Sequence, residues 1–408
     1  MSQASWLGRR RTALLEAAGL LEDLGVDQTE PIDVFWLIEQ LDIWLTFVPL
    51  GTTLGACLPV GRGGIMITTR RQPAVQRFTA AHEIGHWILD HGRPWVDDEE
   101  AILRPSAPER ERIAQLFASY VVMPPPLVDA TAAHHGIGTG PLPEPPQAYL
   151  VARDMGVSYE AAVRQMAELG VISTQDRDRL LHVSPLAAKR ALAHGARPVV
   201  GNADVWPIDE RWNGARLDVT TADEIVIALP ENRTTGFRWM TPTDLIARDK
   251  RHPQPAPPPF ADGSPVSDID ARPDQVARDK VALDDRRRDD EQGEEPPLQV
   301  VTDQYVPGGL PRTSRETISH RRALASAQVL DRPAPRIGAT GRRWLSVQAR
   351  TEGTWRYELA YAPAHEPLAP AVLTFLVEAT VHPTPSVAHA RSLLAAAPAD
   401  DAPGGPSR

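Results

Sequence analysis

The segment at residues 77–91, RFTAAHEIGHWILDH, restricts the fold and the chemistry of this chain more than any other stretch. His82 and His86 are four residues apart, so on a helix both imidazoles project from one face, about 6 Å apart, and can reach one metal ion. Glu83 lies one step round the helix. A carboxylate there is poorly placed to bind the same ion but well placed to take a proton from a water molecule that the ion activates. The motif therefore predicts a metal-dependent hydrolytic site.

The residues around the motif favour a helix with a buried face. Pro73 suits a first helical turn, and Gly92 with Pro94 marks an end, which predicts about 19 helical residues. The alternative interpretation is that His82 and His86 are ordinary histidines on an amphipathic helix. The surrounding residues favour metal binding over this alternative. One stripe of the helix, which we expect to pack inward, contains Phe78, His82, Gly85, His86 and Leu89.

A second helix is expected to bring a further ligand. Residues 106–109 form a capping-box pattern that opens a helix through about residue 122. One of its faces is apolar core, and the adjacent strip places Glu111 beside the small residues Ala114 and Ala118, which allow another helix to approach closely. The alternative for Glu111 is a solvated glutamate that favours the helix dipole, a reading that suits Glu109 better.

These candidates form a complete set for catalytic zinc. Such a site uses three protein ligands and leaves the fourth position to water, and two histidines with one glutamate is a known combination. We therefore predict Zn²⁺ as the cofactor, with His82, His86 and Glu111 as metal ligands and Glu83 as the general base.

Composition limits the remaining possibilities. With 408 residues the chain is expected to form two or three units. Its net charge of −10 argues against direct binding of nucleic acid by the chain as a whole. Cys57 is the only cysteine, so an intrachain disulfide and a thiolate zinc cage are excluded, as suits a reducing cytoplasm. No stretch reaches the ~18 consecutive apolar residues of a membrane span, so we expect no membrane contact.

The order of patterns predicts an α+β arrangement. Residues 10–25 and 31–43 read as helices, and residues 43–50 and 63–69 as short strands separated by a glycine-rich stretch, so a small sheet precedes the metal helix. Residues 149–170 read as helix, turn and helix. DNA reading is the less favoured interpretation of this segment, because Arg164 is the only base-reaching cation of its second helix, and a packing subdomain is expected instead.

From about residue 197 the pattern becomes that of strands and predicts a β-sandwich. A stretch rich in Pro, Asp and Arg at 249–296 reads as a disordered insertion, and residues 389–408 as a disordered tail. The expected domains are residues 1–130, a helical accessory subdomain at 131–196, and the sandwich at 197–248 with 297–388. Candidate strands lie at residues 215–221, 224–229, 236–240, 342–349, 355–361 and 373–381.

Residues 10–175 resemble the ImmA/IrrE-type metallopeptidases, bacterial enzymes that cut DNA-binding repressors. The resemblance rests on PIDVFWLIEQLDI, GGIMITT, RFTAAHEIGHWILDH and a helix ending in FASYVVMP, which occur in the family's order. It implies a zincin-like domain of small sheet and HExxH helix with a helical accessory subdomain, and a function in transcription regulation and stress response. The family's third zinc ligand falls on Glu111, followed by Ala114, Phe117 and Ala118. Gln115 is a departure, where asparagine is frequent.

The strand-rich region, about residues 200–385, resembles the chagasin-like inhibitors of cysteine peptidases, which have an immunoglobulin-like fold. NRTTGFRW, from Asn232, resembles the loop that those inhibitors place against the peptidase, and IGATGRRWLSVQA resembles their second loop. The resemblance implies binding residues at Thr234, Thr235, Gly236 and Phe237. Arg233 stands where proline is usual, and Pro363, Ala364 and His365 stand where the third loop has Arg-Pro-Trp.

The expected function is a cytoplasmic zinc endopeptidase that cleaves a helix-turn-helix repressor in trans, because no repressor domain is apparent in the chain. The β-sandwich is expected to regulate activity or recruit substrate. Two alternatives stay open: a non-catalytic regulatory or binding protein that acts through the sandwich while the peptidase domain senses a ligand or metal, and an inhibitor of a cysteine peptidase. Besides the protein substrate, the expected partners of the sandwich are a cysteine peptidase or another part of the same chain. His91 and Tyr120 are candidates for stabilising the oxyanion, with helix-end packing and core as the alternative readings of each.

Overall fold

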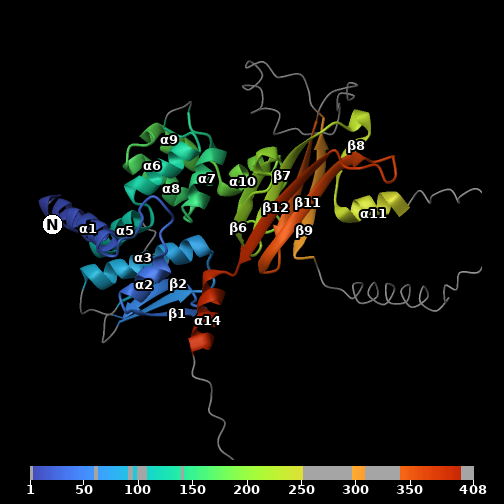
Figure 1. The fold of residues 1–408 in the computed structure, drawn as a ribbon. Helices are drawn as coiled ribbons and strands as arrows, with labels where there is room; N and C mark the ends of the chain where they lie inside the picture. Colours follow the sequence, from blue (N-terminus) through green and yellow to red (C-terminus); the bar gives the residue numbers. More distant parts are fainter. Residues whose placement is uncertain are drawn as a thin grey trace, which may run out of the picture. The chain divides into compact units, whose positions relative to one another are not determined.

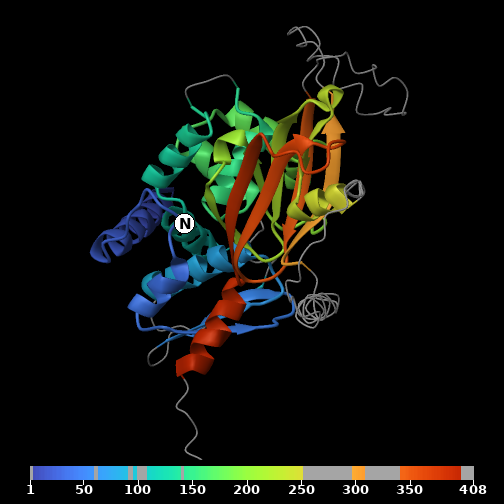
Figure 2. The same cartoon turned by 45° about the vertical axis from the view of Figure 1, so that its right-hand side comes forward.

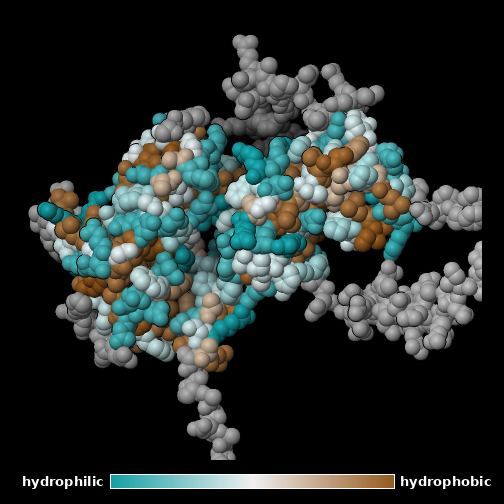
Figure 3. Space-filling view, in the orientation of Figure 1, coloured by the Kyte–Doolittle hydropathy of each residue, from teal (hydrophilic) through white to brown (hydrophobic). Residues whose placement is uncertain are grey.

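A computed structural model describes residues 3–58, 63–90, 95–98, 108–138, 142–250, 296–307 and 341–396 (Figure 1). The chain forms two compact units: residues 1–205 with 383–408, and residues 206–382. Most of the insertion predicted at 249–296 lies outside the described residues. On the face shown in Figure 3, apolar residues are mixed with hydrophilic ones, and no helix among the described ranges is long and apolar enough to cross a bilayer.

The first unit contains the predicted combination of helices and a small sheet, which confirms the α+β fold class. The sheet has the order β1-β3-β2-β4, with β1 parallel to β3 and β2 antiparallel to both of its neighbours. Its elements are α1 (Gln3–Asp23), α2 (Val34–Gln40), β1 (Trp44–Val48), β2 (Thr53–Leu58), β3 (Gly64–Thr68), α3 (Pro73–Leu89), β4 (Trp95–Asp98) and α5 (Glu109–Val122).

Local chemistry places the ends of these helices. The carboxylate of Asp33 accepts hydrogen bonds from the backbone N–H groups of Phe35 and Trp36 and so caps α2. Pro73 occupies the first turn of α3, where its missing N–H is not needed. Helix α3 packs on β2 and β3, and α5 packs along α3 with α1 beyond it.

Five further helices complete the accessory part of this unit. Helices α7 and α8 pack together through their buried faces, and the side chain of Gln165 donates to the carbonyl of Met123 just after α5, at 3.2 Å. Arg164 points to solvent and pairs with Glu160 at 2.7 Å. The helices are α6 (Pro125–His134), α7 (Pro145–Asp154), α8 (Tyr159–Glu168), α9 (Thr174–Leu181) and α10 (Pro185–Leu192).

The end of the chain returns to the first unit. Residues 385–396, within or next to the segment predicted as a disordered tail, form helix α14 (Pro385–Ala396) beside β1 (Figure 2). His389 Nε2 donates to the carbonyl of Leu45 at 2.9 Å, and its ring lies 5.5 Å from that of Phe47. The expectation of disorder from residue 389 was therefore wrong for this helix, which contacts a strand distant in sequence through His389.

The second unit is a sandwich of two four-stranded sheets, in the orders β5-β7-β10-β9 and β6-β12-β11-β8. Inward side chains of both sheets, among them Ile227, Leu345, Leu359 and Phe375, form one buried core. Strands β6 and β12 run parallel, whereas β7, β10 and β9 pair antiparallel in the first sheet and β12, β11 and β8 pair antiparallel in the second. The elements are β5 (Val205–Asp209), β6 (Arg216–Thr220), β7 (Glu224–Glu231), β8 (Phe237–Met240), α11 (Pro242–Lys250), β9 (Leu298–Val306), β10 (Gly341–Ala349), β11 (Gly353–Pro363) and β12 (Leu373–His382).

Candidate metal centre

The structure brings the three predicted metal ligands together. His82 Nε2 and His86 Nε2, on α3, lie 3.1 Å apart, and Oε2 of Glu111, on α5, lies 3.2 Å from each of them. All three residues are buried, with exposed fractions of 0%, 2% and 4%. Among the residues that the structure describes, this is the group of His, Cys, Asp or Glu side chains whose spacing could hold a metal ion.

The donor geometry fits zinc. Zinc bonds of ~2.0–2.1 Å in a tetrahedron separate the ligand atoms by ~3.3 Å, and the observed triangle has sides of 3.1 and 3.2 Å. Two imidazoles and one carboxylate are also a donor set that suits zinc and leaves one coordination position to water. The residues present therefore match the cofactor predicted from the sequence.

The close approach of α3 and α5 depends on Gly85. A Cβ atom at this position would lie 3.1 Å from Cδ1 of Phe117 and 3.4 Å from the carbonyl oxygen of Ala114. Because glycine lacks that atom, α5 lies against α3 and Glu111 reaches the histidines. The small residues that the sequence indicated on α5, Ala114 and Ala118, are buried, and Ala114 lies at the contact with Gly85 of α3.

Glu83 is fully buried on α3, and the main chain of β2 passes beside its carboxylate. A Cβ atom on Gly55 would lie 2.6 Å from Oε1 of Glu83 and 2.5 Å from Cγ2 of Thr79. The glycine-rich stretch was interpreted as a connection between two strands, so this contact was missed. The short run TLGACL, bounded by turn residues, was the available signal for β2.

Two charged residues that sequence reasoning did not select surround His86. Oδ2 of Asp90 lies 2.7 Å from Nδ1 of His86, and Nε of Arg110 donates to the same oxygen at 2.7 Å. Burial raises the pKa of Asp90, but the hydrogen bonds from His86 and Arg110 outweigh it and hold that pKa below its usual value. Asp90 stands four residues after His86, a spacing that could have drawn attention to it.

The positions suggested for an oxyanion-stabilising residue gain no support. His91 lies outside the described residues, and Tyr120 is half-buried on α5.

Fold and site together define the class of this region. A buried cluster of two histidines and one carboxylate, on helices packed over a small mixed sheet, is the arrangement of a metallopeptidase-type domain. Residues 38–166 match the family Peptidase_M78, described as the IrrE N-terminal-like domain, which confirms the resemblance noted for this segment. No curated protein sequence matches the chain.

Solved structures with similarity to part of the chain include two small proteins. One is a cysteine protease inhibitor from Entamoeba histolytica, with 13% identity and a TM-score of 0.23, covering 44% of this chain and 96% of that one. The other is Amebosin, with 13% identity and a TM-score of 0.21, covering 44% of this chain and 98% of that one.

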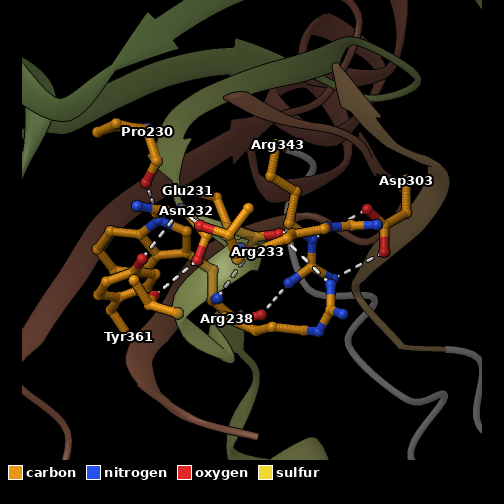
Figure 4. A network of polar contacts seen from close by, with 11 residues as sticks. Pro230, Glu231, Asn232, Arg233, Arg238, Asp303, Arg343 and Tyr361 are labelled. Carbon is orange, nitrogen blue, oxygen red and sulfur yellow. Dashed lines mark hydrogen bonds and ion pairs between the residues drawn. The ribbon is translucent and has the colours of Figure 1, made fainter. Parts of the chain in front are cut away.

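The loop of the second unit that carries the predicted binding residues is internally ordered (Figure 4). The Oδ1 atom of Asn232 accepts from the N–H of Thr234 at 3.1 Å, and Tyr361 accepts from the N–H of Asn232 at 3.0 Å. Glu231 is buried, its Oε1 lies 2.7 Å from Nε of Arg233, and its Oε2 accepts from the N–H of Trp239. These bonds fix a short helical turn, η2 (Arg233–Thr235), that leads into β8.

Two of the three predicted loops of this unit touch each other. Thr234 and Thr235 are exposed at the turn, whereas Gly236 and Phe237 are half-buried. Gly236 adopts φ +80°, its carbonyl accepts from the N–H of Ala364 at 2.9 Å, and a Cβ atom there would lie 2.7 Å from the ring of His365. The start of the second predicted loop, residues 337–340, lies outside the described residues.

Proposed function

We propose that the chain is a zinc-dependent endopeptidase whose metal is held by His82, His86 and Glu111. The observation that carries this proposal is the buried triangle of donor atoms, with sides of 3.1 and 3.2 Å, beside the fully buried Glu83. The match of residues 38–166 to a peptidase family supports the same reading.

In the proposed mechanism, bound zinc supplies Lewis acidity, which makes a water molecule more acidic and polarises the carbonyl of the scissile bond. Glu83 acts as general base: its carboxylate takes a proton from the attacking water and then passes that proton to the leaving amine. Helix α3 positions both the histidine ligands and the general base, because all three residues lie within five consecutive positions of this helix. The contact of β2 with Glu83 at Gly55 limits where the carboxylate can lie.

The test of this mechanism is the variant Glu83→Gln, which keeps size and polarity but cannot accept the proton. We expect zinc content to remain at the wild-type level and peptide cleavage to fall by about 100-fold or more. Glu109→Gln is the matched control, because it makes the same change on α5 outside the donor triangle. Cleavage by Glu83→Gln at the wild-type rate would contradict the mechanism.

We propose a helix-turn-helix repressor acting in trans as the substrate. The support is the resemblance to repressor-cutting enzymes, together with the place of that family's domain at residues 38–166. The test is incubation of the purified chain with the repressor encoded by a neighbouring gene. We expect one cut, made by the wild type and not by Glu83→Gln, and an uncut repressor would reject this substrate.

A second candidate function belongs to the β-sandwich, which we propose regulates activity or recruits substrate. The supporting observation is that two exposed threonines, Thr234 and Thr235, stand on a rigid turn joined to the loop at His365. Replacing both threonines with alanine in the full chain should raise cleavage if the loop is autoinhibitory and lower it if the loop recruits substrate. Thr354→Ala, at an exposed threonine of β11, is the control.

Two further measurements test the remaining alternatives. Titration of a papain-like enzyme with the full chain would reveal inhibition of a cysteine peptidase, and the altered third loop at residues 363–365 leads us to expect weak or no inhibition. If the full chain cleaves no peptide but binds a partner that the loop variant does not bind, the result favours a non-catalytic regulatory protein.

A further inference from the structure

The outer edge of the His86 imidazole, opposite the donor triangle, faces two groups of opposite character. Nδ1 lies 2.7 Å from Oδ2 of Asp90 and 3.0 Å from Nη2 of Arg110. A carboxylate is only an acceptor, whereas a guanidinium is only a donor. The two neighbours therefore favour different tautomers of His86. Asp90 favours a proton on Nδ1, and Arg110 alone would favour a bare Nδ1 with the proton on Nε2.

Three features make Asp90 the dominant neighbour. Its contact with Nδ1 is the shorter of the two. Arg110 already uses its Nε to donate to the same Asp90 oxygen, at 2.7 Å, so the guanidinium supports the carboxylate as well as facing the ring. Asp90 is also the C-cap residue of α3, and its backbone N–H donates to the carbonyl of His86 at 3.1 Å. Both the backbone N–H and the side chain of Asp90 therefore contact His86.

The consequence concerns the opposite nitrogen. A neutral imidazole carries one proton, so a proton held on Nδ1 leaves the lone pair on Nε2, the atom that faces His82 and Glu111. Carboxylate partners of this kind orient metal-binding histidines and raise their basicity. We propose that Asp90, held by Arg110, is a positioning residue that keeps the His86 proton on Nδ1 and so presents Nε2 to the metal. This inference deepens the proposed zinc site and rests on it.

The chain offers a matched control for this pair. In the accessory helices, His135 Nε2 lies 2.6 Å from Oδ2 of Asp154, and Nε of Arg153 donates to Oδ1 of the same residue at 2.7 Å. This trio has the same three residue types, is also partly buried, and contains none of the proposed metal ligands. Replacing Asp154 therefore removes an equivalent carboxylate without touching the donor triangle.

The first measurement is zinc affinity of the full chain, by competition with a chelator. Asp90→Asn and Asp90→Ala should bind zinc about 10- to 100-fold more weakly than the wild type, while Asp154→Asn should stay within twofold. Thermal unfolding of the metal-free proteins checks that each variant folds, and Asp90→Asn, close in size, serves if the alanine variant does not. Wild-type zinc affinity in both Asp90 variants would overturn the proposal.

The second measurement is spectroscopic and does not depend on cleavage. In zinc-loaded protein with ¹⁵N-labelled histidine, we expect Nδ1 of His86 to carry a proton that exchanges slowly with water, and in Asp90→Ala we expect that proton to exchange fast. His86→Gln assigns the signal. A metal bound at Nδ1, or a proton unaffected by Asp90→Ala, would overturn the inference. If the wild type binds no zinc, the proposed function itself fails, which separates the two outcomes.

Discussion

At Gly55 the main chain of β2 comes closer to the proposed general base than any side chain would permit. An added Cβ would lie 2.6 Å from Oε1 of Glu83, so Gly55→Ala must displace either the carboxylate or the strand. We expect cleavage to fall at least about 10-fold, because a displacement of ~1 Å at a catalytic group can cost up to 100-fold, with zinc content unchanged. Gly51→Ala is the control, since nothing lies within 4 Å of its added Cβ. An unaltered rate in Gly55→Ala would show that Glu83 is not held by β2.

Asp154 gives a prediction for stability against pH. Burial raises its pKa, but the hydrogen bond from His135 and the charge of Arg153 outweigh burial, so the pKa in the fold is below its ordinary value of 3.8. A depressed carboxyl pKa stabilises the fold at pH values above the unfolded pKa, and this contribution is lost as the pH falls through the folded value. Asp154→Asn should therefore lose about 1–3 kcal/mol at pH 7, and the gap from wild type should narrow below about pH 4. Urea unfolding at both pH values measures it; an equal gap at both would refute the assignment.

The residues of the metal site could be predicted to different degrees. The spacing of His82 and His86 fixes their common helix face, and the small residues near Glu111 indicate the helix contact, so the cluster follows from local patterns. Asp90 is indicated only by its spacing of four residues from His86, and Gly55 is indicated by no local pattern. One acts through a hydrogen bond at the helix end, and the other through the absence of a side chain at a contact between segments distant in sequence.

Among the elements, the contact of α3 with α5 decides whether the third ligand reaches the site. Gly85→Val would place a branched side chain where even a Cβ lies 3.1 Å from Phe117. Overpacking of this kind costs about 1–3 kcal/mol, and pushing α5 away should weaken zinc binding through Glu111. Zinc affinity and thermal unfolding of the variant test this, with Gly19→Val, in open space on α1, as the control for valine in a helix. Wild-type zinc affinity in Gly85→Val would show that α5 tolerates the displacement.

The strands differ in how well they could be predicted from the sequence. Alternating strands such as β11 and β12 were predicted closely, because one face of each is buried. Strands β2, β4, β5 and β9 were not predicted. Strand β2 resembles a glycine-rich connection, and β9 has mostly half-buried or exposed residues. Helix α14 was missed because its partner is β1, more than three hundred residues earlier.

At the scale of the whole molecule, the first unit is discontinuous, because α14 follows the entire second unit in sequence. A chain truncated after Val205 lacks this helix, so the Leu45 carbonyl loses its contact with His389. We expect faster amide hydrogen exchange in β1 of the truncated chain than in the full chain, with α8 unchanged as an internal reference. Equal exchange in β1 of both chains would show that α14 adds no protection to the sheet.

The proposed function depends on one zinc ion held by two histidines of α3 and one glutamate of α5. Its most direct test is the zinc content of the purified full chain, of Glu111→Ala, and of Glu109→Ala, which removes a glutamate two residues away on the same helix. We predict one zinc per chain in the wild type and in Glu109→Ala, and a clear loss in Glu111→Ala after dialysis against a weak chelator. A full zinc content in Glu111→Ala, or none in the wild type, would contradict this assignment of the metal ligands.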